Sequence, residues 1–215
     1  MDDSVRFLAI EGVIGVGKTT LARMLGERFA ARLVLEEFKE NPFLEDFYKN
    51  PRAWALHTQL FFLLSRFRQM KNLGSPELFD TLVISDYIFQ KNRIYANINL
   101  SDPELRIFED VADVLEVGIP APDLVIYLEA STEVLLDRIR KRGRSYERRI
   151  DFDYIGRLNE AYNHFFFNFD DCPLLIVNTN SVNFSTDTEE FTRLLRILDE
   201  PPVGMRYYNP QKELF

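Results

Sequence analysis

The chain has 215 residues, of which 46% are hydrophobic and 13% aromatic, so one ordered domain with a sizeable core is expected. Its 34 acidic and 26 basic residues give a formal net charge of −8, which repels polyphosphate backbones and argues against a DNA or RNA partner. Because the composition changes at Glu200-Pro201-Pro202, we expect a single domain over residues 1–199 and a tail over residues 200–215 that drapes over the domain or frays.

Five short apolar runs that end at polar residues are typical of parallel strands covered on both faces. They lie at residues 5–11, 32–38, 82–86, 124–128 and 174–178. Apolar residues at spacings of three and four predict helices at residues 19–29, 43–48, 54–70, 103–117, 132–141, 153–169 and 188–198. The alternation of strands and helices predicts an α/β fold, a doubly wound five-stranded parallel sheet with helices on both faces.

A glycine-rich stretch, Gly12-Val13-Ile14-Gly15-Val16-Gly17-Lys18-Thr19, follows the first strand and opens the first helix. It fits the G-x-x-x-x-G-K-[ST] pattern of P-loop NTPases in the context which that pattern requires. Such a loop cradles phosphates with backbone N–H groups, while its lysine neutralises β- and γ-phosphate charge and its hydroxyl can ligate Mg²⁺. ATP or GTP is the expected donor, and a glycine-rich turn without ligand is the alternative. The residues predicted to bind ATP are Gly12, Gly15, Val16, Gly17, Lys18, Thr19 and Thr20.

Basic residues crowd the end of the helix predicted at residues 132–141, in the run Arg138-Ile139-Arg140-Lys141-Arg142-Gly143-Arg144. Arginines spaced in this way can close over a triphosphate, stabilise the transferring phosphoryl group and exclude water. We therefore predict an arginine-rich kinase lid over residues 142–150. The alternative is a solvated basic helix end favoured by the helix dipole. The predicted catalytic residues in this run are Arg138, Arg142 and Arg144.

Several further motifs occur in a fixed order between Val5 and Val177. They are Asn41-Pro42-Phe43-Leu44, Phe47-Tyr48, Trp54, Gln59, Ser65-Arg66-Phe67-Arg68 and Arg142-Gly143-Arg144. In this combination with the P-loop, the chain resembles the deoxynucleoside kinases, a family that includes deoxycytidine, deoxyguanosine and deoxyadenosine kinases. The resemblance implies ATP-dependent phosphorylation of a deoxynucleoside 5′-hydroxyl with Mg²⁺, and it slightly favours purines, deoxyadenosine first.

The resemblance also implies roles for single residues. The family has a carboxylate base at the end of its second strand, where this chain has Glu36 and Glu37; spacing to the Asn-Pro motif favours Glu36, and Glu37 stays an alternative. A hydroxyl that attacks a γ-phosphate also needs such a carboxylate on chemical grounds, although a surface acidic pair would look the same in sequence. The residues matched to the substrate are Tyr48 and Glu147 for the 3′-hydroxyl and Gln59 and Arg66 for the base. For Arg66 a salt bridge on a long helix is nearly as plausible.

Asp86 ends the third predicted strand, where the family has an acidic residue followed by arginine. Such an acid can contact the substrate and, together with Thr19, hold Mg²⁺. Here Tyr87 follows instead of arginine, so one cation of the family's site is missing from its place. Arg93 is the candidate to replace it.

The remaining sequence signals bear on partners and location. The isolated His57 and His164 do not predict zinc. The lone Cys172, an N-terminus without an export signal and the absence of a long apolar run predict a cytoplasmic protein outside the membrane. The phenylalanines at residues 165–167 and 169 exceed one core face and predict a homodimer.

Two other functions stay open. A nucleoside-monophosphate kinase, such as a thymidylate kinase, would need extra arginines to hold the acceptor phosphate, whereas the region of Glu36 is acidic. A P-loop module that binds nucleotide without phosphotransfer would not need the joint set of carboxylate base, lid and Mg²⁺ acid.

Overall fold

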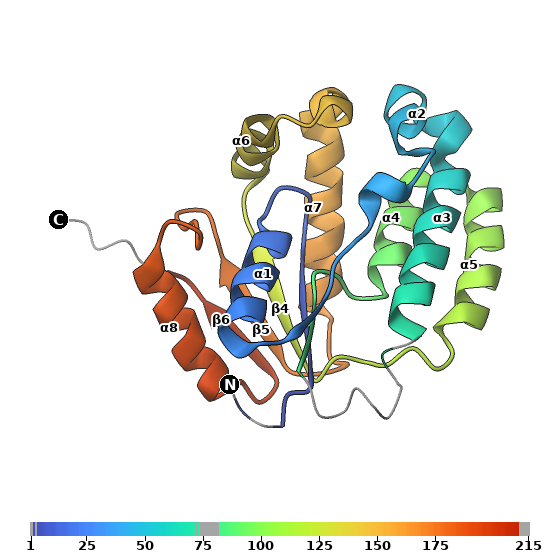
Figure 1. The fold of residues 1–215 in the computed structure, drawn as a ribbon. Helices are drawn as coiled ribbons and strands as arrows, with labels where there is room; N and C mark the ends of the chain where they lie inside the picture. The colour runs from blue at the N-terminus through green and yellow to red at the C-terminus, as the bar shows by residue number, and fades with distance from the viewer. Residues whose placement is uncertain (1, 3, 72, 74–81, 211–215) are drawn as a thin grey trace.

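The computed structural model describes residues 2, 4–71, 73 and 82–210, and it has a parallel sheet with helices on both faces (Figure 1). Six strands follow the order β2-β3-β1-β4-β5-β6, and every neighbouring pair is parallel. Their bounds are β1 Phe7–Gly12, β2 Arg32–Val34, β3 Val83–Ser85, β4 Leu124–Glu129, β5 Leu174–Asn178 and β6 Met205–Tyr208. The central strands β1 and β4 are buried almost throughout, as their continuous apolar sequences require. The predicted doubly wound α/β class is confirmed.

The helices occupy most of the predicted segments. Their bounds are α1 Lys18–Phe29, α2 Leu44–Lys49, α3 Pro51–Lys71, α4 Lys91–Asn99, α5 Asp102–Glu116, α6 Thr132–Arg142, α7 Phe152–Phe167 and α8 Thr188–Asp199, with 3₁₀ turns η1 Phe38–Glu40 and η4 Ser145–Arg149. Helix α1 packs against β1, β2 and β3, whereas α3, α4 and α5 pack on one another and α4 also contacts α7 (Figure 1). None of the helices in the described ranges is both long and apolar enough to cross a bilayer.

The sheet has six strands instead of the predicted five, because part of the expected tail is a strand. Met205–Tyr208 pairs in parallel with β5, and the hydroxyl of Tyr208 donates to Glu190 on α8 at 2.6 Å. This strand covers the hydrogen-bonding edge that β5 would otherwise expose. Residues 211–215 of the predicted tail lie outside the described residues.

The second strand is shorter than predicted, and this places the acidic pair outside the sheet. It ends at Val34 instead of residue 38. Beyond it, the backbone N–H of Glu36 donates to the Asp86 carboxylate at 2.8 Å, and the chain then turns into η1. Alternation along a strand therefore does not decide which way Glu36 and Glu37 point.

The two ends of helix α6 position the lid. Helix α6 starts at the N-cap Ser131, whose hydroxyl accepts from the Val134 N–H at 3.4 Å, and ends at Gly143 with φ 70. Glycine adopts this left-handed conformation without the steric strain of a side chain, and the chain turns back over the sheet there. Arg142 and Arg144 consequently flank the turn.

The phenylalanine cluster is mostly core, in contrast to the expectation that it exceeds one core face. Phe166 and Phe169 are buried, and Phe165 packs partly buried against the same cluster. Only Phe167 of the four points outward, at 80% exposed. This cluster therefore no longer argues for a subunit interface.

Candidate active site

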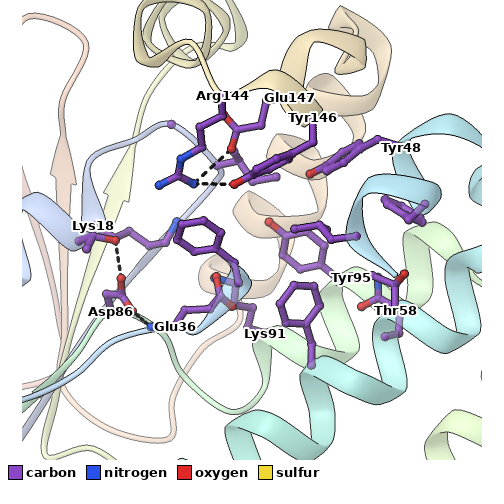
Figure 2. A pocket seen from close by; sticks show the side chains of 18 of the residues that line it. Lys18, Glu36, Tyr48, Thr58, Asp86, Lys91, Tyr95, Arg144, Tyr146 and Glu147 are labelled. Atoms are coloured by element: carbon purple, nitrogen blue, oxygen red, sulfur yellow. Dashed lines mark hydrogen bonds and ion pairs between the residues drawn. The ribbon is translucent and has the colours of Figure 1, made fainter. Parts of the chain in front are cut away.

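A cavity lies above the carboxyl ends of the strands, between the P-loop, α2, α3 and the lid (Figure 2). One end holds charged groups from different elements, including Lys18, Glu36, Asp86 and Lys91, and the other is walled by aromatic rings. Ligand sites of open α/β sheets occupy this edge, because loops and helix N-termini from several strands converge there.

The P-loop has the geometry that phosphate binding needs. Gly12, Gly15 and Gly17 all have positive φ, at 146, 91 and 112. A side-chain carbon on Gly15 would lie 2.8 Å from a carbon of Ile139 and 2.9 Å from the Leu135 carbonyl oxygen, so the loop passes too close to α6 for any larger residue. The predicted phosphate loop is thus tightly fixed between β1 and the lid helix.

Lys18 lies at the charged end of the cavity. Its Nζ donates to the carbonyl oxygens of Gly12 at 2.7 Å and Val13 at 3.2 Å. Burial and the neighbouring Lys91 lower the pKa of Lys18 to about 8, although nearby carboxylates raise it. A polyphosphate at this position would supply the anionic partner that the ammonium lacks.

Thr19 and Asp86 meet at the start of α1. The Thr19 hydroxyl donates to Oδ2 of Asp86, and Oδ1 of the same carboxylate accepts the N–H of Glu36. The first turn of α1 thereby brings together a hydroxyl and a carboxylate beside the phosphate loop. Both are oxygen ligands of the kind that Mg²⁺ takes.

Glu36 is held by two cations. Oε1 accepts from Nε of Arg66 at 3.0 Å and also from Nη2, and Oε2 lies 3.3 Å from Nζ of Lys91. Burial opposes ionisation, but Lys91 and Arg66 outweigh it and hold the pKa of the Glu36 carboxyl well below its ordinary value. Glu37, by contrast, is exposed and does not line this cavity. These contacts favour Glu36 over Glu37 as the base.

Arg66, predicted to contact the base of the substrate, is turned to Glu36 and Asn92 instead. It is 3% exposed, and Nη1 donates to Oδ1 of Asn92 while Nε and Nη2 hold Glu36. A contact of Arg66 with a bound base stays a prediction. Its main partner in the structure is the Glu36 carboxylate.

The cation missing after Asp86 is not replaced by Arg93. The guanidinium of Arg93 pairs with Glu109, Asp113 and Glu116 on α5, so the suggestion that it serves the site is wrong. Tyr87 is fully buried, and its hydroxyl donates to Gln69 on α3 at 2.6 Å. The sequence reasoning missed Lys91, which supplies a cation to the site.

Glu147 ties the lid arginines together. Its carboxylate accepts from Arg142 at 2.7 and 3.1 Å, and it is 5% exposed. It also accepts from Arg144 at 3.3 Å (Figure 2). The guanidinium of Arg144 also lies 4.0 Å from the centre of the Phe38 ring. The predicted sugar contact and the predicted lid therefore form one unit above the cavity.

Arg138 is used differently from the other two arginines. Its guanidinium donates to the carbonyl oxygens of Val16 at 3.2 Å and Val182 at 3.0 Å, and to Thr179 Oγ1 at 3.0 Å. It thus anchors the P-loop to the segment after β5. A direct role of Arg138 in catalysis stays a prediction.

The far end of the cavity is polar only in places. Tyr48 stacks on Tyr146, with ring centroids 6.0 Å apart, and Tyr95 faces them across the cavity (Figure 2). Gln59 is 3% exposed and lines the cavity, and its amide makes no hydrogen bond within the described part of the chain. An unused donor and acceptor beside aromatic rings suit a flat heterocycle. The wall residues that the motifs missed are Phe38, Phe62, Tyr95, Tyr146 and Tyr154.

Comparisons with known proteins point to one family. The sequence model described as "Deoxynucleoside kinase" matches residues 8–200. A deoxyguanosine kinase of Bacillus subtilis (strain 168) is 35% identical over 163 residues, which are 73% of this chain and 76% of that protein. A deoxyadenosine kinase of Dictyostelium discoideum is 30% identical over 207 residues, which are 94% of this chain and 83% of that protein.

Solved structures agree with the sequence matches. A deoxyadenosine kinase from M. mycoides with products dCMP and a flexible dCDP bound has a TM-score of 0.76 and 27% identity, covering 89% of this chain and 99% of that one. The structure of that enzyme with bound dATP also has a TM-score of 0.76 and 27% identity, over 88% of this chain and 99% of that one. The likeness thus extends over most of the chain.

Proposed function

This chain belongs to the deoxynucleoside kinase family, and on that premise we propose that it transfers the γ-phosphoryl group of ATP to the 5′-hydroxyl of a purine deoxynucleoside. The observation that carries the proposal is the ionised Glu36, held by Arg66 and Lys91 between the P-loop and an aromatic cavity. A base in this position lies between the expected donor phosphates and the expected acceptor.

The transfer requires the groups at both ends of the cavity. The acceptor's 5′-oxygen forms a bond to the γ-phosphorus, while the bond from that phosphorus to the β–γ bridging oxygen breaks and its electron pair leaves with ADP. The hydroxyl proton passes to the Glu36 carboxylate. Lys18 and the lid arginines balance the phosphoryl charge, and closure of the lid excludes water.

Thr19 and Asp86 would hold Mg²⁺ in this reaction. Their hydroxyl and carboxylate oxygens lie together at the start of α1. A site with one or two protein oxygens suits Mg²⁺, which takes its other ligands from water and substrate phosphates. When bound, the ion would neutralise charge on the donor's phosphates.

The preference for purines rests on similar proteins alone. The similar proteins include deoxyguanosine and deoxyadenosine kinases, and deoxyadenosine remains our first choice. The amide of Gln59, which makes no hydrogen bond to any described residue, can present a donor and an acceptor to the edge of several bases. Arg66 contributes to the same wall from its position beside Glu36.

A panel of acceptors tests the proposed function. Deoxyadenosine, deoxyguanosine, deoxycytidine, thymidine, dAMP and dTMP are each assayed with ATP and with GTP, and the ADP or GDP released is compared with the phosphorylated acceptor formed. The highest kcat/KM is expected for a purine deoxynucleoside with ATP. Transfer only to dAMP or dTMP would make the protein a nucleoside-monophosphate kinase, and binding without any transfer would make it a nucleotide-binding module.

The lid arginines provide a first mutational prediction. Arg142→Ala and Arg144→Ala should each lower kcat by about 10- to 100-fold and change nucleoside KM less, because they meet charge that develops in the transition state. Arg140→Ala is the matched control, since Arg140 is exposed on the same helix end and does not line the cavity. A change confined to KM in both variants would show that the lid does not act on the phosphoryl group.

We further propose a cytoplasmic homodimer. Helix α5 exposes Ile107 at 53% and Val114 at 73%, and the adjacent α3 exposes Leu64 at 39% (Figure 1). Apolar side chains exposed on neighbouring helices favour a subunit contact. The lone Cys172 fits a reducing compartment. Light scattering should give twice the 25.3 kDa of one chain, and the mass of one chain would contradict the dimer.

A further inference from the structure

Lys91 is an unusual residue for its place in the fold. It is 2% exposed, lines the cavity and is the first residue of α4, whose first turn carries no acidic side chain. A positive charge at a helix N-terminus opposes the helix dipole, and burial of an ammonium is unfavourable without an anion. The cost of placing an ammonium here indicates that the charge of Lys91 has a role in the site.

Glu11 provides one anchor for that charge. This residue of β1 is fully buried, and its carboxylate accepts the N–H groups of Gly12 at 2.8 Å and Ile88 at 3.0 Å and the hydroxyl of Tyr162 at 3.3 Å. Nζ of Lys91 lies 3.9 Å from Oε1 of Glu11. With three partners of its own, Glu11 is a fixed negative group under the lysine.

The other partner of Lys91 is Glu36. Both carboxylate oxygens of Glu36 have protein contacts, but the contacts are unequal. Oε1 accepts two N–H groups of Arg66, whereas among the described residues Oε2 accepts only the Lys91 ammonium, at 3.3 Å. A carboxylate oxygen accepts about two hydrogen bonds, so Oε2 keeps one acceptor position open.

We propose that Lys91 is the positioning residue that fixes Glu36 so that Oε2 receives the hydrogen bond and then the proton of the acceptor hydroxyl. The inference rests on the proposed function and adds to it the atom that accepts the proton and the residue that holds it. Lys91 supplies, from the first turn of α4, a cation to a site where Tyr87 follows the acid. Arg66 and Lys91 then hold the Glu36 carboxylate through its two different oxygens.

Replacement of the lysine tests this role. Lys91→Met keeps the length of the side chain and removes its charge, and kcat should fall by about 10- to 100-fold while nucleoside KM changes little, because a misplaced base slows the chemical step and not binding. Lys91→Arg, which restores a cation, should recover part of the lost kcat. Lys141→Met is the control, since Lys141 is a 74% exposed lysine on α6.

A double-mutant cycle separates a positioning role from an independent one. In a Glu36→Gln background, Lys91→Met should lower kcat by no more than about twofold, because the carboxylate through which it acts is already gone. If the two losses multiply, Lys91 does not act through Glu36 and the inference is overturned. An unchanged kcat in Lys91→Met with only a lower melting temperature would overturn it as well.

A second variant and crystal structures allow the positioning role to be tested even if Lys91→Met does not fold. Lys91→Met removes the ammonium that lies 3.9 Å from the buried Glu11 carboxylate, and this loss could unfold the protein. If the single variant does not fold, the double variant Glu11→Gln/Lys91→Met, which removes both charges, is assayed in its place. Crystal structures of wild type and the Lys91 variants give the orientation of Glu36 without any assay. Wild type that phosphorylates no deoxynucleoside would refute the proposed function, whereas an unmoved Glu36 in the variants would refute the positioning role.

Discussion

Replacing Lys18 with methionine should reduce phosphotransfer by about 10²- to 10³-fold or more, because one preorganised cation aimed at a phosphoryl group has that value in a water-excluded site. The ammonium lies in the P-loop, 2.7 Å from the Gly12 carbonyl oxygen, at the charged end of the cavity. Methionine keeps the length of the side chain and loses the charge together with the two hydrogen bonds to the Gly12 and Val13 carbonyl oxygens. Turnover of ATP with deoxyadenosine measures the effect.

The fold should tolerate this change. Burial lowers the pKa of Lys18 to about 8 from 10.5, so at neutral pH the folded protein holds this proton less firmly than the unfolded chain does. The buried ammonium thus opposes folding, which offsets the loss of its hydrogen bonds to the Gly12 and Val13 carbonyl oxygens, and Lys18→Met should melt close to the wild-type temperature. Lys141→Met serves as the surface control. Turnover close to wild type in a folded Lys18→Met protein would remove the P-loop from the mechanism.

The parts of the site that were predictable from sequence are those fixed by local geometry. The phosphate loop needs glycines, lysine and hydroxyl at set spacings, and Gly12, Gly15 and Gly17 have the positive φ angles that such a loop requires. Asp86 could be placed beside Thr19 because the carboxyl ends of neighbouring parallel strands share one edge. Neither inference needed knowledge of distant contacts.

Contacts between distant segments were not predictable in the same way. Arg66 and Glu36 are 30 residues apart, and the sequence offers an equally good role for the arginine at the substrate's base. Arg93 carries the same charge as Lys91 two residues away, but it faces α5 and its acidic side chains. Which of two neighbouring cations enters a site depends on which face of a helix is buried.

The sequence of helix α4 explains why Lys91 was not predicted as a site residue. Its buried residues include the polar Lys91 and Asn92 as well as Ile94 and Ala96, so polar side chains interrupt the apolar periodicity. Lys91 is one of several polar residues in its segment and gave no such signal, whereas Glu11 is a charged residue inside the otherwise apolar strand β1. Buried charges of this kind mark sites because they need partners.

The strand β6 was missed for a related reason. Its four residues, Met205–Tyr208, follow two prolines and are mostly exposed, so they show neither a long apolar run nor a clear alternation. What makes them a strand is the free edge of β5. That edge is a property of the assembled sheet and not of the segment.

Loss of the general base Glu36 should also have a large effect on turnover. Glu36→Gln should lower kcat by about 10²- to 10⁴-fold with little change in nucleoside affinity, because glutamine keeps the size and hydrogen-bonding reach of the side chain but cannot accept the proton. Glu37→Gln, one residue later, should have a much smaller effect than Glu36→Gln. The exposed Glu37 lines the adjoining cleft with Lys18 and Arg144, but it does not line the cavity that is expected to hold the acceptor.

The contacts of Glu36 determine which controls the kinetic comparison needs. Glutamine at position 36 retains an oxygen that can accept from Arg66, but it leaves the charge of Arg66 and Lys91 without the Glu36 anion. A melting curve and calorimetric binding of deoxyadenosine must therefore accompany the kinetics, so that a loss of fold is not read as a loss of base. If Glu36→Gln binds nucleoside, melts as a folded protein and turns over as wild type, Glu36 is not the base. A large loss of kcat in Glu37→Gln alone would move the base to Glu37, and no loss in either variant would refute proton acceptance by a carboxylate at this strand end.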